Sequence, residues 1–337
     1  MNIIRVTRNL TLTTLACAAA TVSTPTLSQT DPSKMVDAFE LAGGKFDGFR
    51  RSGAKGVCAS AEFVGSAEGR ALSTASAFSG TPVPVIARFS IGGGNPKAPD
   101  NARSQRNLAL QFNLPNSESW QMGNISAPVF GAATPEQLLG RLLSLAPEAD
   151  TKKPNATKVQ QFVEANPEVL LQGKYFAGQP VPASFAKVNY WGVHGFGFVD
   201  ASGKKQLGKW IFEPVGGTQG LSDDEAKAKG SDFLFEDLRQ RVAAGSVVFD
   251  FNLQLAQPGD KIDSAVVPLP DDRKKVSLGK LTIKSVAPDA TGACLTITYN
   301  PMVLPKGIEP TNDPMLAARA APYAVSLGRR LGEGPKQ

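Results

Sequence analysis

Hydrophobic and polar residues alternate with a period of two along several parts of the chain. Between residues 247 and 255, Phe249, Phe251 and Leu253 alternate with the polar residues Asp250 and Asn252. This alternation is typical of a β-strand with one buried and one solvated face. The same pattern predicts further strands at residues 83–90, 108–113, 191–199, 209–213, 280–286 and 294–300.

Turn and helix signals lie between these stretches. The sequences Asp-Ala-Ser-Gly at 200–203 and Asp-Ala-Thr-Gly at 289–292 predict hairpin turns. Capping-box patterns at Thr134 and Ser222 predict helix starts. Helical periodicity at 232–245 and 314–333 predicts two more helices, and Pro322 is expected to end or kink the last one just before Tyr323.

Many short antiparallel strands with inserted and trailing helices indicate an α+β fold. A curled antiparallel sheet that closes into a β-barrel with inserted and C-terminal helices fits this order of elements best. No internal repeat and no long Pro/Ser linker divides the chain, so residues 29–337 are expected to form a single domain.

The first 28 residues differ from the rest. Arg5 and Arg8 precede an apolar run at 10–22, and small and polar residues follow it. This order is typical of a secretory signal peptide, predicted here at 1–28, while a retained anchor or lipidation at Cys17 is less well supported. The chain is therefore expected to be exported to the periplasm, with no membrane span after cleavage.

Charge, histidine and cysteine content limit the chemistry. Basic and acidic residues are interleaved at a formal net charge of +6, a pattern that argues against nucleic-acid binding. His194 is the only histidine, which excludes metal triads built from several histidines together with most zinc sites. After removal of the signal peptide two cysteines would remain, Cys58 and Cys294; buried free thiols are the favoured interpretation and a disulfide is the alternative.

Candidate chemistry lies in the C-terminal helical stretch. Arg319 and Tyr323 are one helical turn apart and can share a face. An arginine beside a phenol stabilises the phenolate, which is a good ligand for ferric iron, and haem iron is held by tyrosine in some proteins. Taken alone, the pair is better explained by a helix with an amphipathic tyrosine and a solvated arginine face.

A set of motifs spread along the chain favours the iron-binding interpretation. These motifs are AKGVC, PVIARFS, NARSQRNLALQF, APVF, YWGVHGF, FLFEDLRQR, GIEPTNDP and RAAPYAVSLGRR. Between residues 37 and 332 the sequence resembles the haem catalase superfamily, and most of all its small exported members, the catalase-related peroxidases. The C-terminal flavodoxin-like domain of the large catalases is not expected. The resemblance implies an antiparallel β-barrel with haem b buried beside it.

The resemblance also implies roles for individual residues on the proximal side of the haem. Tyr323 matches the axial phenolate ligand of the haem iron, and Arg319 matches the arginine that hydrogen-bonds this ligand. His194 and Asp313 match the partners that orient that arginine. The positions that bind the haem propionates are matched by Arg50, Arg88 and Arg330.

The distal positions depart from the family pattern. Gly53 occupies the position of the distal histidine, which exchanges a proton with the bound peroxide. Ser126 stands at the position assigned to the distal asparagine, and Ser90 is retained. These residues imply a weak haem-dependent peroxidase that acts on hydrogen peroxide or organic peroxides with an unknown electron donor. The alternative is a catalytically silent haem-binding protein.

Overall fold

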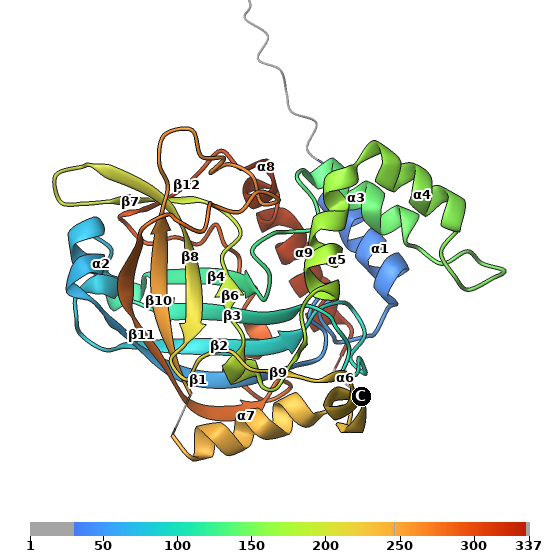
Figure 1. Cartoon of the computed structure of the whole chain (residues 1–337), viewed down its shortest axis with the longest axis horizontal. Coiled ribbons are helices and arrows are strands. Elements are labelled where there is room, and N and C mark those ends of the chain that lie inside the picture. Colours follow the sequence, from blue (N-terminus) through green and yellow to red (C-terminus); the bar gives the residue numbers. More distant parts are fainter. Residues whose placement is uncertain (1–29, 246, 335–337) are drawn as a thin grey trace, which may run out of the picture.

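Eight antiparallel strands close into a β-barrel in the computed structural model, which describes residues 30–245 and 247–334. The predicted signal peptide at 1–28 lies outside the described residues. The barrel order is β10-β11-β1-β2-β3-β4-β6-β8, and a pairing between β8 and β10 closes it (Figure 1). The predicted α+β fold with an antiparallel barrel is thereby confirmed. The barrel strands are β1 Gly56–Gly65, β2 Val83–Ile91, β3 Arg106–Asn113, β4 Ser119–Ile125, β6 Tyr190–Trp191, β8 Lys205–Pro214, β10 Val248–Leu255 and β11 Lys275–Pro288.

Four short strands complete the sheets. Strand β7 (Phe196–Val199) pairs with β8, and β12 (Ile308–Pro310) pairs with β7 at the edge of the main sheet. A separate two-stranded sheet joins β5 (Val181–Pro182) to β9 (Gly220–Leu221). The turn at 200–203 connects β7 to β8 in the hairpin that the sequence predicts.

The inside of the barrel is filled with aromatic side chains. Phe212 and Phe251 stack with ring centroids 4.2 Å apart, and Phe196 stacks on Trp210 at 4.3 Å. The alternation at 247–255 corresponds to this packing, because Phe249, Phe251 and Leu253 point inward and are fully buried. Burying side chains of this size is the main source of stabilisation for such a core.

Two predicted strands are not continuous strands in the structure. The predicted strand at 191–199 is interrupted at 192–195, where Gly192 approaches Trp210 so closely that a Cβ would lie 2.1 Å from its ring. This interruption removes His194 from the ladder. At 294–300 the prediction was wrong, because the 3₁₀ helix η5 (Ala293–Thr296) occupies its start. A disulfide between Cys294 and Cys58 holds this segment against β1, and the favoured prediction of free thiols is corrected accordingly.

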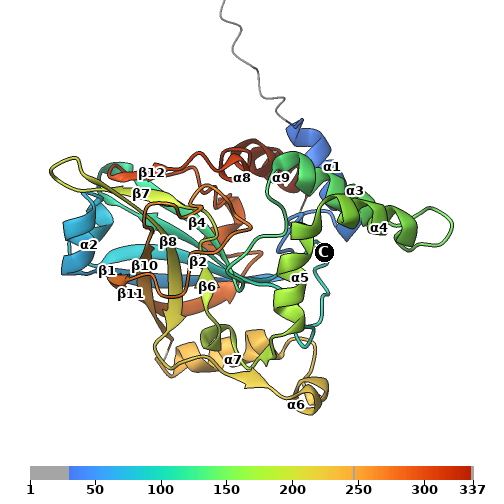
Figure 2. The same cartoon turned by 45° about the horizontal axis from the view of Figure 1, so that its top comes forward.

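Nine α-helices lie around the barrel among the described residues. Helices α1, α3 and α4 gather at one side of it, and α9 runs beside them (Figures 1 and 2). None of the described helices is long and apolar enough to cross a membrane. The helices are α1 Pro32–Gly43, α2 Ala67–Leu72, α3 Pro135–Ser144, α4 Ala156–Ala165, α5 Leu170–Ala177, α6 Asp223–Ala228, α7 Phe233–Ala243, α8 Pro314–Ala317 and α9 Ala320–Gly332.

The helix ends follow local sequence signals. Thr134 caps α3 by accepting a hydrogen bond from the backbone of Gln137, and Ser222 forms the predicted capping box at α6. The C-terminal helical stretch is divided, as Pro322 predicts, but the break precedes the proline. Pro322 lies in the first turn of α9, where its missing N–H group costs no intrahelical hydrogen bond. The division leaves Arg319 at the start of α9 and Tyr323 one turn further on.

Candidate functional site

The candidate site is built on the outer face of strands β1 to β4. Residues directly opposite each other in an antiparallel sheet point to the same face. Two adjacent rows across these strands therefore share the outer face, although Arg88 and Ser90 in these rows are only 3% exposed. Their burial indicates that other segments cover this part of the sheet. The first row holds Gly56, Ser90, Asn107 and Ile125, and the second holds Cys58, Arg88, Ala109 and Gly123.

Tyr323 and its predicted partners form one chain of hydrogen bonds. A guanidinium N–H of Arg319 donates to the Tyr323 hydroxyl, and the guanidinium carbon lies 5.1 Å from the centre of the phenol ring. The other terminal nitrogen of Arg319 lies 3.1 Å from Nε2 of His194. On its far side His194 contacts Asp313, with 2.7 Å between Nδ1 and Oδ2. Residues separated by more than a hundred positions are thus joined in the predicted order.

The protonation of His194 follows from its surroundings. Burial lowers the pKa of His194, and the nearby Arg319 guanidinium lowers it further, against the opposing effect of the Asp313 carboxylate. The imidazole is therefore neutral, with the Nδ1 proton donated to Asp313 and Nε2 accepting from Arg319. Asp313 is fully buried and also caps α8 by accepting from the backbone of Met315. The hydrogen bonds between Asp313 and His194 and between His194 and Arg319 thereby fix the direction in which Arg319 presents its remaining N–H groups to Tyr323.

The three predicted propionate arginines lie close together. Burial lowers the pKa of Arg50 to about 9, and repulsion from Arg88 and Arg330 contributes to this shift. Burial also lowers the pKa of Arg330 to about 10, again with a contribution from Arg88. Asp289 is the carboxylate of this basic cluster and forms an ion pair with Arg88 at 2.8 Å. The Arg50 guanidinium lies over the ring of Tyr299, 5.5 Å from its centre.

The chemistry of the basic cluster fits a haem with two propionates. Arg50, Arg88 and Arg330 together with Asp289 carry a net charge of +2, which two carboxylates would neutralise. Among the described residues, four buried side-chain polar atoms lack a hydrogen-bond partner, and two of them are Arg330 Nε and Tyr299 Oη in this cluster. Such atoms are costly unless a partner is supplied. Bidentate recognition of carboxylates is also what guanidinium groups do best.

Gly53, at the predicted distal position, has a backbone conformation that favours glycine. Its φ is +66°, in the left-handed region that L-residues rarely adopt. A Cβ at this position would lie 2.9 Å from Ser90 Oγ, 3.4 Å from Asn107 Nδ2 and 3.5 Å from an Arg88 nitrogen. The structure therefore brings Gly53 together with Ser90 and Arg88.

Ser126 is hydrogen-bonded to the backbone of Arg106, whereas Asn107 is hydrogen-bonded to the side chains of Ser90 and Gln105. The Ser126 hydroxyl accepts a hydrogen bond from the backbone N–H of Arg106, and the Ser126 N–H donates back to the Arg106 carbonyl. Asn107, which the sequence reasoning missed, donates to Ser90 Oγ at 3.1 Å and accepts from Gln105 at 2.6 Å. The signal that could have found Asn107 is its position just before the strand predicted at 108–113, in the outward phase of the alternation.

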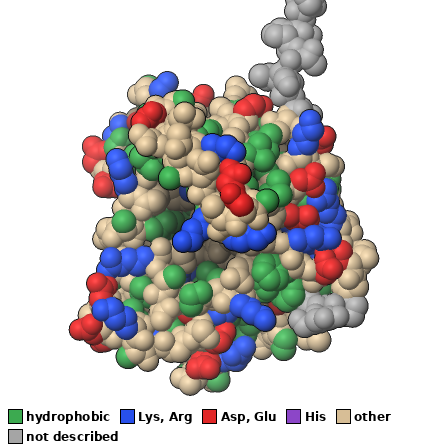
Figure 3. All heavy atoms as spheres, turned by 90° about the vertical axis from the view of Figure 1, so that its right-hand side faces the viewer, with side chains coloured by type: hydrophobic (Ala, Val, Ile, Leu, Met, Phe, Trp, Pro, Cys, Tyr) green, Lys and Arg blue, Asp and Glu red, His purple; other side chains and the backbone are tan. Residues whose placement is uncertain are grey.

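Ser126 also lines a cavity of about 200 Å³. Aromatic rings of Tyr175, Phe176 and Trp191 form one part of its wall, and Lys187 forms another. Figure 3 shows that the side of the molecule on the right in Figure 1 is hollowed, with Lys and Arg side chains around the hollow. No histidine is visible on this face, which agrees with the burial of His194.

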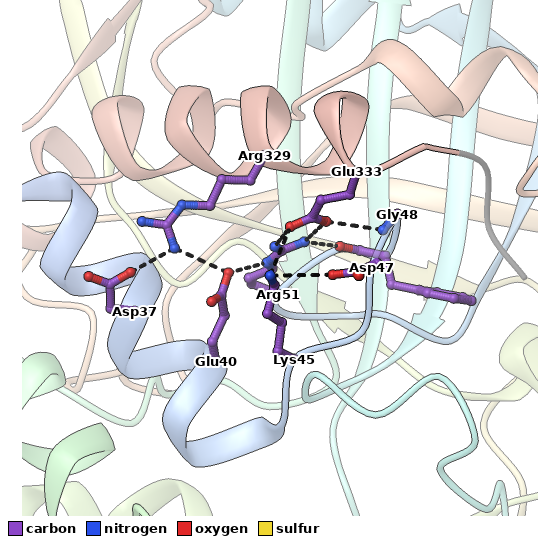
Figure 4. Close-up of polar contacts among 9 residues, drawn as sticks. Asp37, Glu40, Lys45, Asp47, Gly48, Arg51, Arg329 and Glu333 are labelled. Carbon is purple, nitrogen blue, oxygen red and sulfur yellow. Dashed lines mark hydrogen bonds and ion pairs between the residues drawn. The ribbon is translucent and has the colours of Figure 1, made fainter.

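Arg51 and Arg329, the sequence neighbours of Arg50 and Arg330, belong to a second network of ion pairs beside the basic cluster. Figure 4 shows this second network. Arg51 is buried and pairs with Glu40 of α1 and with Glu333 just after α9. Arg329 pairs with Asp37 at 2.7 Å and with Glu40 at 3.1 Å. Because Arg51 follows Arg50 and Arg329 precedes Arg330, this second network holds the backbone on both sides of the basic cluster.

Comparison with known proteins identifies the family. A sequence model of the catalase family matches residues 49–337. The chain belongs to the catalase family. It is 40% identical over 299 residues to a catalase-related peroxidase of Synechococcus elongatus, with 89% of this chain and 88% of the relative covered. A catalase-related peroxidase of Mycolicibacterium paratuberculosis is 31% identical over 306 residues, with 89% and 95% covered.

Solved catalases share the fold of this chain, although their sequence identity to it is lower than that of the two peroxidases. A bacterial catalase has a TM-score of 0.75 at 22% identity, and 84% of this chain and 57% of that chain are covered. Catalase A of Saccharomyces cerevisiae has a TM-score of 0.74 at 18% identity, and 84% and 61% are covered. The chain therefore spans about three-fifths of the length of these two solved catalases.

Proposed function

We propose that this protein is a haem-dependent peroxidase that reduces hydrogen peroxide or organic peroxides at the expense of an external electron donor. The observation that carries this proposal is the hydrogen-bonded chain from Asp313 through His194 and Arg319 to Tyr323. The relatives at 40% and 31% identity, both named catalase-related peroxidases, add independent support. Haem b would be the cofactor, with Tyr323 as the ligand of its iron.

The residues on the proximal side would hold the cofactor and tune its ligand. Bound haem supplies the redox chemistry that cleaves the peroxide O–O bond. Arg319 donates an N–H to the Tyr323 oxygen and would stabilise the negative charge of an iron-bound phenolate, and His194 keeps the guanidinium in place. Arg50, Arg88 and Arg330 would hold the two propionates.

The residues on the distal side can bind a peroxide but are poor proton carriers. The Ser90 hydroxyl and the Asn107 amide are hydrogen-bonded to each other and lie beside Gly53. Neither group acts as a base near neutral pH, and the loss of a general base typically slows a reaction about 10²–10⁴-fold. The proposed activity is therefore weak.

The second candidate is a haem-binding protein without peroxidase turnover. Gly53 supports this candidate, because the structure gives the position neither an imidazole nor room for a Cβ without movement of Ser90. Both candidates require the same proximal site, so they differ only in what happens to peroxide.

One experiment separates the two candidates. The purified protein is loaded with haemin, its absorption spectrum is recorded, and peroxide-dependent oxidation of a dye is compared with that of free haemin. The enzyme is expected to give a ferric phenolate spectrum together with dye oxidation above the free-haemin rate. The same spectrum without such oxidation would identify the silent haem binder, and no haemin uptake would overturn both candidates.

The location of the protein is part of the same proposal. We propose that residues 1–28 are a signal peptide and that the chain works in the periplasm. The disulfide between Cys58 and Cys294 supports an oxidising compartment, because such bonds are rare in reducing cytosol. Cleavage after residue 28, detected by mass spectrometry of the mature protein, tests this assignment.

A further inference from the structure

One short segment of the chain contacts all three arginines of the basic cluster. We call residues 289–297 the anchor segment. At its start, the Asp289 carboxylate accepts two hydrogen bonds from the Arg88 guanidinium, at 2.8 Å from Nε and 3.0 Å from Nη2. This bidentate geometry fixes the plane of the guanidinium as well as its position.

Backbone carbonyls of the anchor segment fix the other two arginines. Nη2 of Arg50 donates to the Cys294 carbonyl at 2.7 Å and to the Ile297 carbonyl at 3.0 Å. Nη2 of Arg330 donates to the Leu295 carbonyl at 2.8 Å. A guanidinium carries five N–H donors. The contacts with the anchor segment use only some of these donors in each arginine, so they orient the group without using all of its N–H groups.

The anchor segment is attached to the barrel by the disulfide. Cys58 lies in β1 directly opposite Arg88 in β2, and its bond to Cys294 holds the middle of the anchor segment against these strands. The two cysteines are buried with Ile297 and Tyr299 in a small apolar cluster of their own. Because η5 is only four residues long, it cannot hold this position by its own helical hydrogen bonds.

We propose that the Cys58–Cys294 disulfide is a positioning element of the haem carboxylate site. The bond fixes the anchor segment, and the anchor segment holds Arg50, Arg88 and Arg330 ready for two carboxylates. Asp289 stays beside Arg88 without the bond, because Pro288 before it is paired with Val57 of β1. The carbonyls at 294–297 lose their attachment to β1, and Arg50 and Arg330 then lose their fixed orientation relative to Arg88. This inference rests on the proposed haem-binding function and concerns how firmly the cofactor is retained.

Reduction of the disulfide gives the simplest perturbation. A dithiol reductant breaks the Sγ–Sγ bond and supplies two electrons and two protons, so that Cys58 and Cys294 become thiols while the dithiol is oxidised to its own disulfide. The bond is buried, so reduction is carried out before haemin loading and is verified by counting thiols with a maleimide. The Cys58→Ser/Cys294→Ser variant provides the same state without a reductant.

The test measures the rate at which bound haemin leaves for an excess of a haem-scavenging apoprotein. Release from the reduced protein and from the double variant is expected to be at least about tenfold faster than from the oxidised protein, a factor that corresponds to roughly 1.4 kcal/mol. The reductant is expected to have no further effect on the double variant. Ser60→Ala is the matched control, because Ser60 lies two residues along β1 and contacts Ser285 at an exposed position.

A neutral ligand separates positioning of carboxylates from general stabilisation of the fold. Haemin dimethyl ester has no charged propionates, so its release rate is expected to differ less than twofold between the oxidised and disulfide-free proteins. Equal effects on haemin and its ester would overturn the inference, as would a haemin release rate that stays within twofold after reduction. Failure of the oxidised protein to take up haemin at all would overturn the proposed function as well.

Discussion

The proximal and distal sides of the candidate site are built from different kinds of side chain. On the proximal side, Asp313, His194, Arg319 and Tyr323 are titratable or charged and follow one another in a single hydrogen-bonded chain. On the predicted distal side, Gly53 adjoins the uncharged Ser90 and Asn107, and the charged group near it is Arg88 of the basic cluster. Under the proposed function, this difference separates the residues that would hold a haem from the residues that would exchange protons with a peroxide. The proximal set of residues can be complete while the distal set lacks its proton-transferring histidine.

The largest expected effect comes from removing the proposed iron ligand. Tyr323→Phe is expected to lower haemin-dependent peroxidase activity by more than about 100-fold, because even the partners of a metal ligand are often worth 10–100-fold. The ferric phenolate absorption should disappear from the spectrum as well. Tyr175→Phe is the control, since this tyrosine lines the cavity beside Ser126. An unchanged spectrum in Tyr323→Phe would assign the iron to another residue.

A smaller loss is expected when the ligand stays and its partner is removed. Arg319→Gln keeps a hydrogen-bond donor but removes the positive charge beside the Tyr323 oxygen. Activity is expected to fall about 10–100-fold, as for other residues that support a metal ligand. The phenolate absorption should shift rather than vanish, which a spectrum of the loaded variant reports. Arg329→Gln is the matched control, because Arg329 lies on the same helix but belongs to the network with Asp37 and Glu40.

Restoring a proton carrier on the distal side is expected to raise the activity. Gly53→His should increase the rate of reaction with peroxide at least about tenfold, toward the 10²–10⁴ that a general base typically contributes. The left-handed backbone makes the substitution costly by roughly 1–2 kcal/mol. Ser90→Ala in the same chain removes the hydroxyl oxygen that lies 2.9 Å from the new Cβ.

Gly53→Ala is the control for this gain, because it carries the same backbone strain without an imidazole. Rates are measured by stopped-flow mixing of the loaded proteins with peroxide. If Gly53→His and Gly53→Ala react equally fast, then the absent histidine does not limit the site.

The smallest effect concerns stability between pH 7.5 and 5.5. The folded-state pKa of His194 is lowered, so the unfolded chain binds a proton more readily. The contribution of His194 to the free energy of unfolding is complete above its unfolded-state pKa of about 6.5. As the pH falls below this value the contribution is lost, with a slope of at most about 1.4 kcal/mol per pH unit. Denaturant unfolding at a series of pH values measures this slope. Because the chain has one histidine, His194→Gln should flatten the slope in this range; an unchanged slope would contradict the assignment.

The sequence predicts the barrel well because its signal is local. Alternation around Phe249 and Phe251 depends only on neighbouring residues facing opposite sides of one strand, and the structure places these residues inside. The predicted strand at 294–300 failed because its local pattern was overridden by the bond from Cys294 to Cys58, 236 positions away. The interruption at 192–195 escaped prediction for a similar reason, since it depends on how closely Trp210 approaches Gly192.

The site residues were found through family motifs, and the structure adds the partners that no motif names. Asp289 and the carbonyls of η5 act on the arginines only after the chain folds, and neither leaves a pattern in the sequence. Asn107 could be placed outward from its strand, but its contact with Ser90 depends on the register between β2 and β3.

The aromatic interior of the barrel and the candidate haem site lie on opposite faces of strands β1 to β4. Most of the apolar surface that stabilises the fold is therefore buried without any contribution from a porphyrin. The empty protein is accordingly expected to fold, to survive purification and to accept a porphyrin chosen afterwards. Zinc protoporphyrin, which is fluorescent and carries the same two propionates, would then turn this chain into an optical reporter of its own pocket.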